Sequence, residues 1–194
     1  RSVFLFAVIV FLQLVLLPLH LKLIIMAIIV KVKGMEPTWG DACFIAENAT
    51  LAGNCHLGDN CSIWYGAVLR ADVDGIRCGN RVNVQDCACL HQSQGTPCIL
   101  GDDVSVGHGA VVHGATVHHG ALIGMNATVL DGAEVGPGAI VAAGAVVTQG
   151  THIPAHEIWG GIPARRIKTC QPGQAEEYAR HYAGYLKDWY REAE

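Results

Sequence analysis

The sequence predicts a mainly β protein, a solenoid of short parallel strands followed by one C-terminal α-helix. Large aliphatic residues recur every six positions, and a small residue follows most of them four positions later. In the second half of the chain the large residues are Val117, Ile123, Val129, Val135, Val141 and Val147. In the first half they are Ile45, Leu51, Leu57, Ile63 and Leu69. Near the C-terminus, aromatic residues recur at spacings of three and four, which indicates a helix.

The period of six indicates an internal repeat, because it matches neither a helix nor a simple alternating strand. The small residues of the second half are Ala121, Ala127, Ala133, Ala139 and Ala145, each preceded by Gly or Asn. Each unit therefore reads as a short strand with one large and one small inward residue, followed by a turn that tolerates positive φ. Three units complete a triangular coil, and stacked coils bury a ladder of aliphatic side chains.

The chain divides into three segments. Residues 2–21 contain no Asp, Glu, Lys or Arg and are long enough to cross a bilayer. However, the chain starts at Arg1, and "MAIIVKVKG" from Met26 reads as a natural beginning for the repeats. We therefore interpret residues 1–25 as an extraneous hydrophobic leader rather than a membrane anchor, and residues 26–170 as the β-solenoid domain.

After Val147 the repeat is expected to break. Pro154 and Pro163 follow, and proline cannot donate to a strand ladder, so continuous pairing should end there. Residues 171–194 then form the predicted C-terminal helix, which packs on the solenoid. Its apolar face carries Tyr178, Tyr182, Tyr185 and Trp189.

Composition and cysteine usage point away from several classes of protein. A formal net charge of −4 gives no nucleic-acid or anionic-membrane signal. The eight cysteines are not spaced as a secreted disulfide framework. Cys55 and Cys61 occupy small inward positions, whereas Cys87 and Cys89 are expected to point outward. Free thiols in a reducing cytosol are the simplest interpretation, which predicts a cytoplasmic protein.

Two histidines stand out in "SVGHGAVVHG", residues 105–114. His108 and His113 are five residues apart, so an extended chain separates their Cα atoms by up to about 16 Å. Zinc holds imidazole nitrogens at about 2.0–2.1 Å, and two rings of one strand at this spacing are poorly placed to meet at one ion. The spacing favours a metal site to which a neighbouring subunit adds a ligand.

Longer motifs carry a family resemblance. "RADVDGIRCGNRVNVQDCACLH", "VGHGAVVHG" and "LIGMNATVLDGAEVG" resemble the γ-class carbonic anhydrases and their close relatives among the left-handed parallel β-helix proteins. The resemblance extends from Met26 to the C-terminus. Three histidines and a Gln-Asp pair at matching places are more specific than the hexapeptide repeat, which many acyltransferases share.

The resemblance implies a homotrimer with a metal at each subunit interface. His91 and His113 would come from one subunit and His108 from its neighbour. The metal would be Zn²⁺, with Fe²⁺ or Co²⁺ as alternatives, and CO₂ and bicarbonate would be the substrates. With three nitrogen ligands, Zn²⁺ keeps an open position for a water whose pKa falls to about 7, which provides hydroxide.

The same resemblance assigns further site residues. Gln85 would orient the hydroxide or CO₂, and its parity with His91 along the strand predicts that it projects toward the same side. Arg70, Asp72 and Asp86 match charged residues around the family's interface, and for Arg70 and Asp86 trimer assembly is an equally good role. Tyr185 matches a tyrosine that relatives place near the metal, although packing of the helix is the simpler interpretation. The neighbouring His118 and His119 match no ligand and are expected to be surface residues.

Two departures from the family keep other functions open. Val73 stands where relatives carry an acidic residue for proton export, and the loop "QSQGTPC" after His91 contains no carboxylate. Fast turnover as a carbonate dehydratase is therefore in doubt. The alternatives are an acyl-CoA transferase or thioesterase that uses one catalytic His, and a non-catalytic metal-binding scaffold subunit. Metal content and a CO₂ hydration assay discriminate among the three.

Overall fold

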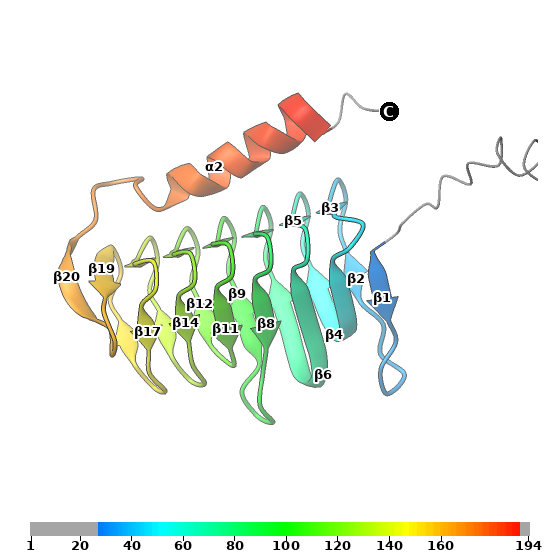
Figure 1. The fold of residues 1–194 in the computed structure, drawn as a ribbon, viewed down its shortest axis with the longest axis horizontal. Helices are drawn as coiled ribbons and strands as arrows, with labels where there is room; N and C mark the ends of the chain where they lie inside the picture. The colour runs from blue at the N-terminus through cyan, green and yellow to red at the C-terminus, as the bar shows by residue number, and fades with distance from the viewer. Residues whose placement is uncertain (1–26, 191–194) are drawn as a thin grey trace, which may run out of the picture.

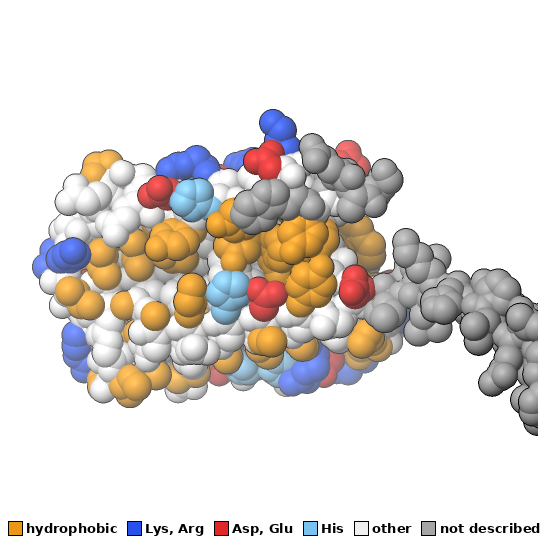
Figure 2. Space-filling view, turned by 45° about the horizontal axis from the view of Figure 1, so that its top comes forward, with side chains coloured by type: hydrophobic (Ala, Val, Ile, Leu, Met, Phe, Trp, Pro, Cys, Tyr) orange, Lys and Arg blue, Asp and Glu red, His pale blue; other side chains and the backbone are white. Residues whose placement is uncertain are grey.

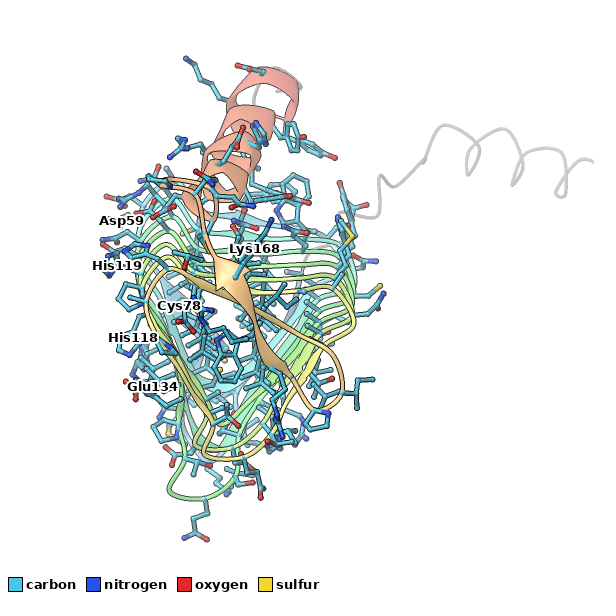
Figure 3. The ribbon with its side chains drawn as sticks, turned by 90° about the vertical axis from the view of Figure 1, so that its left-hand side faces the viewer. Asp59, Cys78, His118, His119, Glu134 and Lys168 are labelled. Carbon is cyan, nitrogen blue, oxygen red and sulfur yellow. The ribbon has the colours of Figure 1, made fainter. Side chains whose placement is uncertain are left out.

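A computed structural model describes residues 27–190 of the chain. It confirms the predicted fold class, a parallel β-helix of hexapeptide repeats with a C-terminal helix (Figure 1). Viewed along its axis, the stack of coils has a triangular outline (Figure 3). The predicted leader of residues 1–25 lies outside the described residues. Within the described range, no helix is long and apolar enough to span a membrane.

Strands of successive coils pair in parallel and form three faces, which we number in the order that the chain visits them. Face one contains β1 (Ile28–Val30), β8 (Cys89–His91), β11 (Val111–His113), β14 (Thr128–Val129) and β17 (Val146–Val147). Face two contains β2 (Thr38–Trp39), β9 (Cys98–Leu100), β12 (Thr116–Val117), β15 (Glu134–Val135) and β18 (His152–Ile153). The long strands β4 (Thr50–Leu57) and β6 (Val68–Cys78) run through both faces and join them into one sheet.

Face three is a separate sheet. It contains β3 (Phe44–Ile45), β5 (Ser62–Ile63), β7 (Asn83–Val84), β10 (Ser105–Val106), β13 (Leu122–Ile123), β16 (Ile140–Val141) and β19 (Glu157–Gly160). The strand β20 (Arg165–Thr169) closes this sheet by pairing antiparallel with β19. Its edge strand at the other end is β3, which pairs with β5.

The core consists of the repeat positions that the sequence indicates. Val117, Ile123, Val129, Val135, Val141 and Val147 are all at most 1% exposed. The small positions, including Cys55 and Cys61, are buried beside them and complete one continuous hydrophobic cluster. Each large side chain stacks on its counterpart in the next coil, as Leu90 does on Leu69 and Val112.

The expected break after Val147 is wrong. The parallel ladder continues through β18, which pairs with β15, and through β19, which pairs with β16. Ile153, six positions after Val147, is fully buried. Pro154 is tolerated because β18 is the last described strand of face two: the equivalent Gly136 donates its N–H to the next coil, but at Pro154 no further coil follows on this face. Parallel pairing ends beyond Pro163, where β20 reverses direction.

The C-terminal helix lies along face three and runs back toward the first coils (Figure 1). It comprises α2 (Glu176–Tyr185) and a final π-helical turn, Leu186–Tyr190. Ala175, at its start, packs with Leu122, Ile140 and Ile158 of face three. At its far end, the Tyr190 ring lies 5.2 Å from that of Trp64. The view from this side shows hydrophobic side chains along the face, with histidine and acidic side chains among them (Figure 2).

Candidate metal centre

His91 and His113 lie side by side on face one. They are register partners at the ends of the adjacent strands β8 and β11. Their rings face each other, with His91 Nδ1 3.0 Å from His113 Nε2. The strands place both rings outside the core because each histidine follows an inward residue, Leu90 or Val112, that is fully buried.

A carboxylate holds the far nitrogen of each ring. His113 Nδ1 is 2.7 Å from Asp131 Oδ1, and His91 Nε2 is 3.2 Å from Asp72 Oδ1. Arg70 donates a hydrogen bond to the other oxygen of Asp72. Burial raises the pKa of Asp72, but hydrogen bonds from Arg70 and His91 outweigh this effect, so the pKa lies below its ordinary value.

Asp131 is held in the same way. Burial raises its pKa, but the hydrogen bond and charge of His113, with hydroxyl donors from the loop after β8, bring the pKa below its ordinary value. Ser93 Oγ donates to Asp131 Oδ2 at 3.2 Å, and Thr96 Oγ1 donates to Oδ1 at 3.4 Å. Asp131 is therefore an ionised acceptor that orients the His113 ring.

This arrangement fits a cation between the two rings. A neutral imidazole carries one N–H, and if each ring donates it to its carboxylate, the two facing nitrogens carry only lone pairs. Their 3.0 Å separation is then stable only with a proton or a metal ion between them. Two ligands of a tetrahedral zinc ion lie about 3.3 Å apart, since each Zn–N bond is about 2.0–2.1 Å. A carboxylate on the second nitrogen is the usual partner of metal-binding histidines.

His108 lies elsewhere, on the corner turn between face three and face one. Its Nδ1 is 2.8 Å from Asp86 Oδ2, in the corresponding turn of the previous coil. Its Nε2 is 3.2 Å from the hydroxyl of Tyr182 on α2. Burial, with the negative charge of Asp86, raises the pKa of Tyr182 to about 12, so the phenol stays protonated. His108 therefore repeats the pattern of the other two histidines, with one nitrogen on a carboxylate.

Gln85 does not share a side with His91, and the parity prediction is wrong. The chain turns a corner at Asp86–Cys87, where Cys87 has a φ of 58°, so alternation along a strand does not continue through it. Gln85 lies on face three beneath the helix, in a pocket that Tyr178 also lines. It is buried and donates to Asn83 Oδ1 at 3.0 Å. Gln85 therefore accompanies His108, not the His91–His113 pair.

The remaining predicted residues are distributed as follows. Asp86 contacts His108, while Arg70 and Asp72 contact the His91 side of the site. Tyr185 packs against Tyr182, with ring centroids 5.4 Å apart, and it is Tyr182 that reaches His108. Cys87 is exposed on the corner turn and Cys89 is half-buried. Within residues 27–190, no three His, Cys, Asp or Glu side chains gather to hold a metal ion.

Sequence reasoning missed Asp131 and Tyr182 as contacts of the histidines. A signal for Asp131 exists, because it follows His113 by three repeats and so lies one coil further along the stack. Gln92 was also missed. It is fully buried directly after His91, and its Oε1 atom has no hydrogen-bond partner.

The other histidine cluster is separate. On face two, Glu134 accepts from His118 at 2.7 Å and from His152 at 3.0 Å (Figure 3). These hydrogen bonds lower the pKa of Glu134, whose side chain is substantially exposed.

Comparisons with known proteins identify the group to which this architecture belongs. A family model described as bacterial transferase hexapeptide (six repeats) matches residues 40–71 and 114–149. A protein of Methanocaldococcus jannaschii named "Probable carbonic anhydrase" is 48% identical over 74% of this chain and 90% of its own length. Gamma carbonic anhydrase 1, mitochondrial, of Arabidopsis thaliana is 42% identical over 64% of this chain. That match spans 48% of the plant protein, about half of its length.

A solved structure shows the same fold. The hexapeptide transferase family protein from Anaplasma phagocytophilum superposes with a TM-score of 0.80 at 32% identity. The match covers 84% of this chain and 98% of that one. With 48% identity to a relative that it covers almost completely, and with the repeats and histidines at the resembling positions, the chain belongs to the γ-carbonic-anhydrase-like family of left-handed β-helix, hexapeptide-repeat proteins.

Proposed function

We propose that this protein is a carbonic anhydrase that interconverts CO₂ and bicarbonate at a zinc site between two copies of the chain. One observation carries the proposal: each of His91, His108 and His113 has one ring nitrogen on a carboxylate and the other directed elsewhere. A carboxylate on the second ring nitrogen is common among metal-binding histidines, and His91 and His113 in addition bring their other nitrogens within 3.0 Å of each other. Relatives that carry the carbonic anhydrase name support the choice of reaction.

The positions of the histidines favour a shared site. His91 and His113 end strands of face one near its edge with face two, while His108 occupies the edge with face three. One edge of a subunit therefore meets a different edge of its neighbour. Such a head-to-tail contact closes into a ring of identical subunits. In a homotrimer, each subunit offers its His108 edge to one neighbour and its His91–His113 edge to the other.

The residues of the chain divide the work as follows. A Zn²⁺ ion held by His91, His113 and the neighbouring subunit's equivalent of His108 would provide hydroxide at neutral pH, because zinc lowers the pKa of a bound water to about 7. Asp72, Asp86 and Asp131 hold the three rings so that their other nitrogens are available. Gln85 enters the site with His108 and presents an amide to CO₂. Arg70 fixes Asp72.

Proton release is the weak point of this site. Val73 is exposed where relatives carry an acid, and residues 92–97 contain no carboxylate. We expect the proton to leave through solvent, so the rate of CO₂ hydration should rise with buffer concentration. The eight free thiols are consistent with a reducing compartment, and we place the protein in the cytoplasm.

Mixing two inactive variants tests the shared site. His91→Ala and His108→Ala should each lose zinc, because each removes one of three protein ligands. In mixed trimers, an H91A chain supplies His108 to an H108A neighbour that keeps His91 and His113. We therefore expect zinc and CO₂ hydration to return in mixtures and in neither variant alone.

His118→Ala is the matched control, since it removes a carboxylate-bound histidine from face two. It should retain zinc and activity. If verified mixed trimers recover no zinc, His91 and His108 do not serve one shared site. If zinc returns without hydration of CO₂, the protein is a metal-binding scaffold.

Acyl transfer is the second candidate, and His108 is the observation that favours it. Its Nε2, opposite the carboxylate-bound Nδ1, could act as a general base, and the structural relative belongs to a transferase family. This function needs no metal and only one histidine. Metal-free protein that transfers an acyl group from acyl-CoA, with activity lost in H108A and kept in H91A, would establish it.

A further inference from the structure

Cys43 and Cys61 are neighbours on adjacent strands of face three. Phe44 pairs in parallel register with Ser62, and the Phe44 amide donates to the Cys61 carbonyl at 2.9 Å. Each cysteine comes one position before this pair. Adjacent strands lie about 4.8 Å apart, which falls within the Cα separation of about 4.4–6.8 Å that a disulfide spans.

This pairing distinguishes Cys43 and Cys61 from the other thiols. All eight cysteines lie in the described part of the chain, and among them no other two occupy neighbouring register positions. Cys55 and Cys98, for example, flank Ile76 on its two sides, so a strand separates them.

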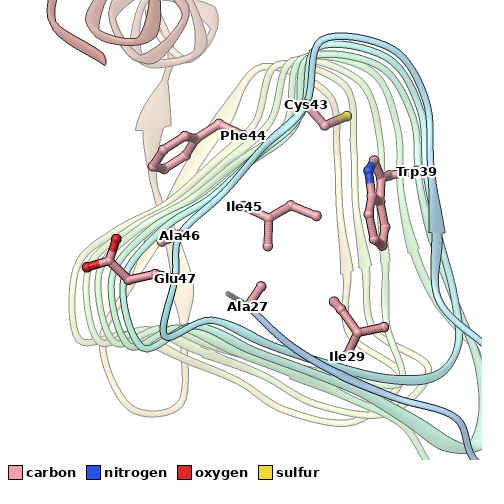
Figure 4. Close-up of a pocket in the computed structure, with 8 residues that line it drawn as sticks. All are labelled: Ala27, Ile29, Trp39, Cys43, Phe44, Ile45, Ala46 and Glu47. Carbon is pink, nitrogen blue, oxygen red and sulfur yellow. The ribbon is translucent and has the colours of Figure 1, made fainter. Parts of the chain in front are cut away.

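The pair lies in the first two coils of the part of the solenoid that the structure describes. Cys43 helps to line a hollow of about 430 Å³ together with Ile29, Trp39 and Glu47 (Figure 4). Cys43 is half-buried, whereas Cys61 is fully buried behind it. A small oxidant can therefore reach Cys43 first. Because β3 is the edge strand of its sheet and pairs with β5 alone among the described strands, it can shift to bring the sulfurs together.

The two thiols also differ in acidity. With both thiols protonated, Cys43 Sγ donates to the Gly58 carbonyl and Cys61 Sγ to the Gly79 carbonyl, each at 3.1 Å. When Cys43 ionises, a hydrogen bond from the Cys61 thiol lowers the pKa of Cys43 to about 7, against the opposing effect of burial. The same hydrogen bond, with burial, raises the pKa of Cys61. The thiolate is the nucleophilic form, so Cys43 is the attacking sulfur and Cys61 the resolving one.

We propose that Cys43 and Cys61 form a dithiol site that hydroperoxides oxidise to a disulfide. The Cys43 thiolate attacks the peroxide oxygen, the O–O bond breaks, and a sulfenic acid forms as water or an alcohol leaves. The Cys61 sulfur then attacks the sulfenic sulfur, the S–O bond breaks and a second water leaves. The two thiols lose two electrons and two protons, and the peroxide is reduced. The bond links the first coil to the second.

Peptide mapping of the full-length protein tests this site. The reduced protein is treated with hydrogen peroxide alone, its remaining thiols are alkylated, and it is cleaved after Glu47 and before Asp59. These cuts place Cys43, Cys55 and Cys61 on three different peptides. We expect the Cys43 and Cys61 peptides to be joined, lighter by two hydrogens, and separated again by dithiothreitol.

Variants identify the roles of the two sulfurs. Cys61→Ala fits its site, because Ala121 and Ala139 fill the same small position in later coils. It should abolish the joined peptide and slow alkylation of Cys43 at pH 7 roughly tenfold, because the thiolate loses its donor. Cys55→Ala, a buried thiol without a register partner, is the control and should leave both results unchanged.

Three outcomes overturn the proposal. In the first, Cys43 and Cys61 remain free to alkylate while the exposed Cys87 is oxidised. In the second, Cys43 becomes sulfinic acid without pairing. In the third, the C55A control loses the joined peptide as completely as C61A does.

Discussion

Asp131 offers a sharp test of the proposed metal centre, because it contacts His113 and would act on a metal only through that ring. Its carboxylate accepts the His113 ring proton at 2.7 Å and two hydroxyl hydrogen bonds from Ser93 and Thr96. Asp131→Asn keeps the shape and an acceptor oxygen but removes the charge. Asp131→Ala removes both the acceptor and the charge, so the ring also loses its orientation.

The expected magnitudes follow from these differences. Loss of a carboxylate behind a metal-binding histidine weakens metal affinity by about 10–100-fold, or about 1.4–2.8 kcal/mol. In the Asn variant, the Ser93 and Thr96 hydroxyls can rotate to accept from the new amide, which leaves the amide oxygen for His113. We therefore expect D131N near the lower limit and D131A near the upper limit.

Zinc competition against a chromogenic chelator, on protein whose assembly has been verified by sedimentation, measures these losses. The control is Glu134→Gln, which removes the carboxylate between two histidines of face two and should leave zinc affinity unchanged. The reasoning fails if D131A binds zinc as tightly as the parent protein, or if E134Q weakens binding as much as D131A does.

Three other predictions concern stability. Leu90→Ala should lower the free energy of unfolding by about 2–5 kcal/mol, measured in urea, because this side chain is fully buried between coils. Gly124→Ala should cost about 3 kcal/mol, because its Cβ would come within 2.6 Å of the backbone of the next coil. Gly144 has a φ of 68° but open space around it, so Gly144→Ala should lower the free energy of unfolding by only about 1 kcal/mol. If calorimetry shows equal losses of stability for the Gly124 and Gly144 variants, this contrast is contradicted. The lowered pKa of Asp72 predicts stabilisation that is present above its unfolded pKa of about 3.9 and lost as pH falls below it. Asp72→Asn should therefore flatten the dependence of the urea midpoint on pH in the acid range, and an unchanged dependence would refute the assignment.

Most of the fold is predictable from the sequence because one small unit repeats. A buried Val or Ile every sixth position and a Gly or Asn before the small residue determine strand, turn and coil without long-range information. Pro154 misled the prediction because the rule against proline in strands applies only where a neighbouring strand would accept its N–H. Pro154 follows the last described strand of face two, where no further coil would accept an N–H, so its missing donor costs nothing.

The site was less predictable, for geometric reasons. The three histidines proposed as ligands were visible as residue types, but alternation along the chain could not place Gln85, because the corner at Cys87 interrupts the strand. The choice between Tyr182 and Tyr185 depends on how the helix is rotated on face three. The rotation is determined by how the helix packs on face three, and the spacing of the aromatic residues along the helix does not specify it.

The returning C-terminal helix has a consequence for how this chain folds. In a simple solenoid each coil depends only on its neighbours, so early coils can form while later ones are still being synthesised. Here the Tyr190 ring lies 5.4 Å from that of Phe44 in the first coil, a contact across most of the domain. The aromatic surface of the first coils therefore stays uncovered until residues 176–190 have been synthesised and have left the ribosome.

This long-range contact should also change the unfolding transition. A stack of independent coils frays from its ends, whereas a helix that bridges the stack couples the first coils to the last. Non-local closure of this kind slows folding, because the loop entropy is lost before the contact forms. The protein should therefore unfold as one unit, and removal of the helix should broaden the transition as well as lower its midpoint.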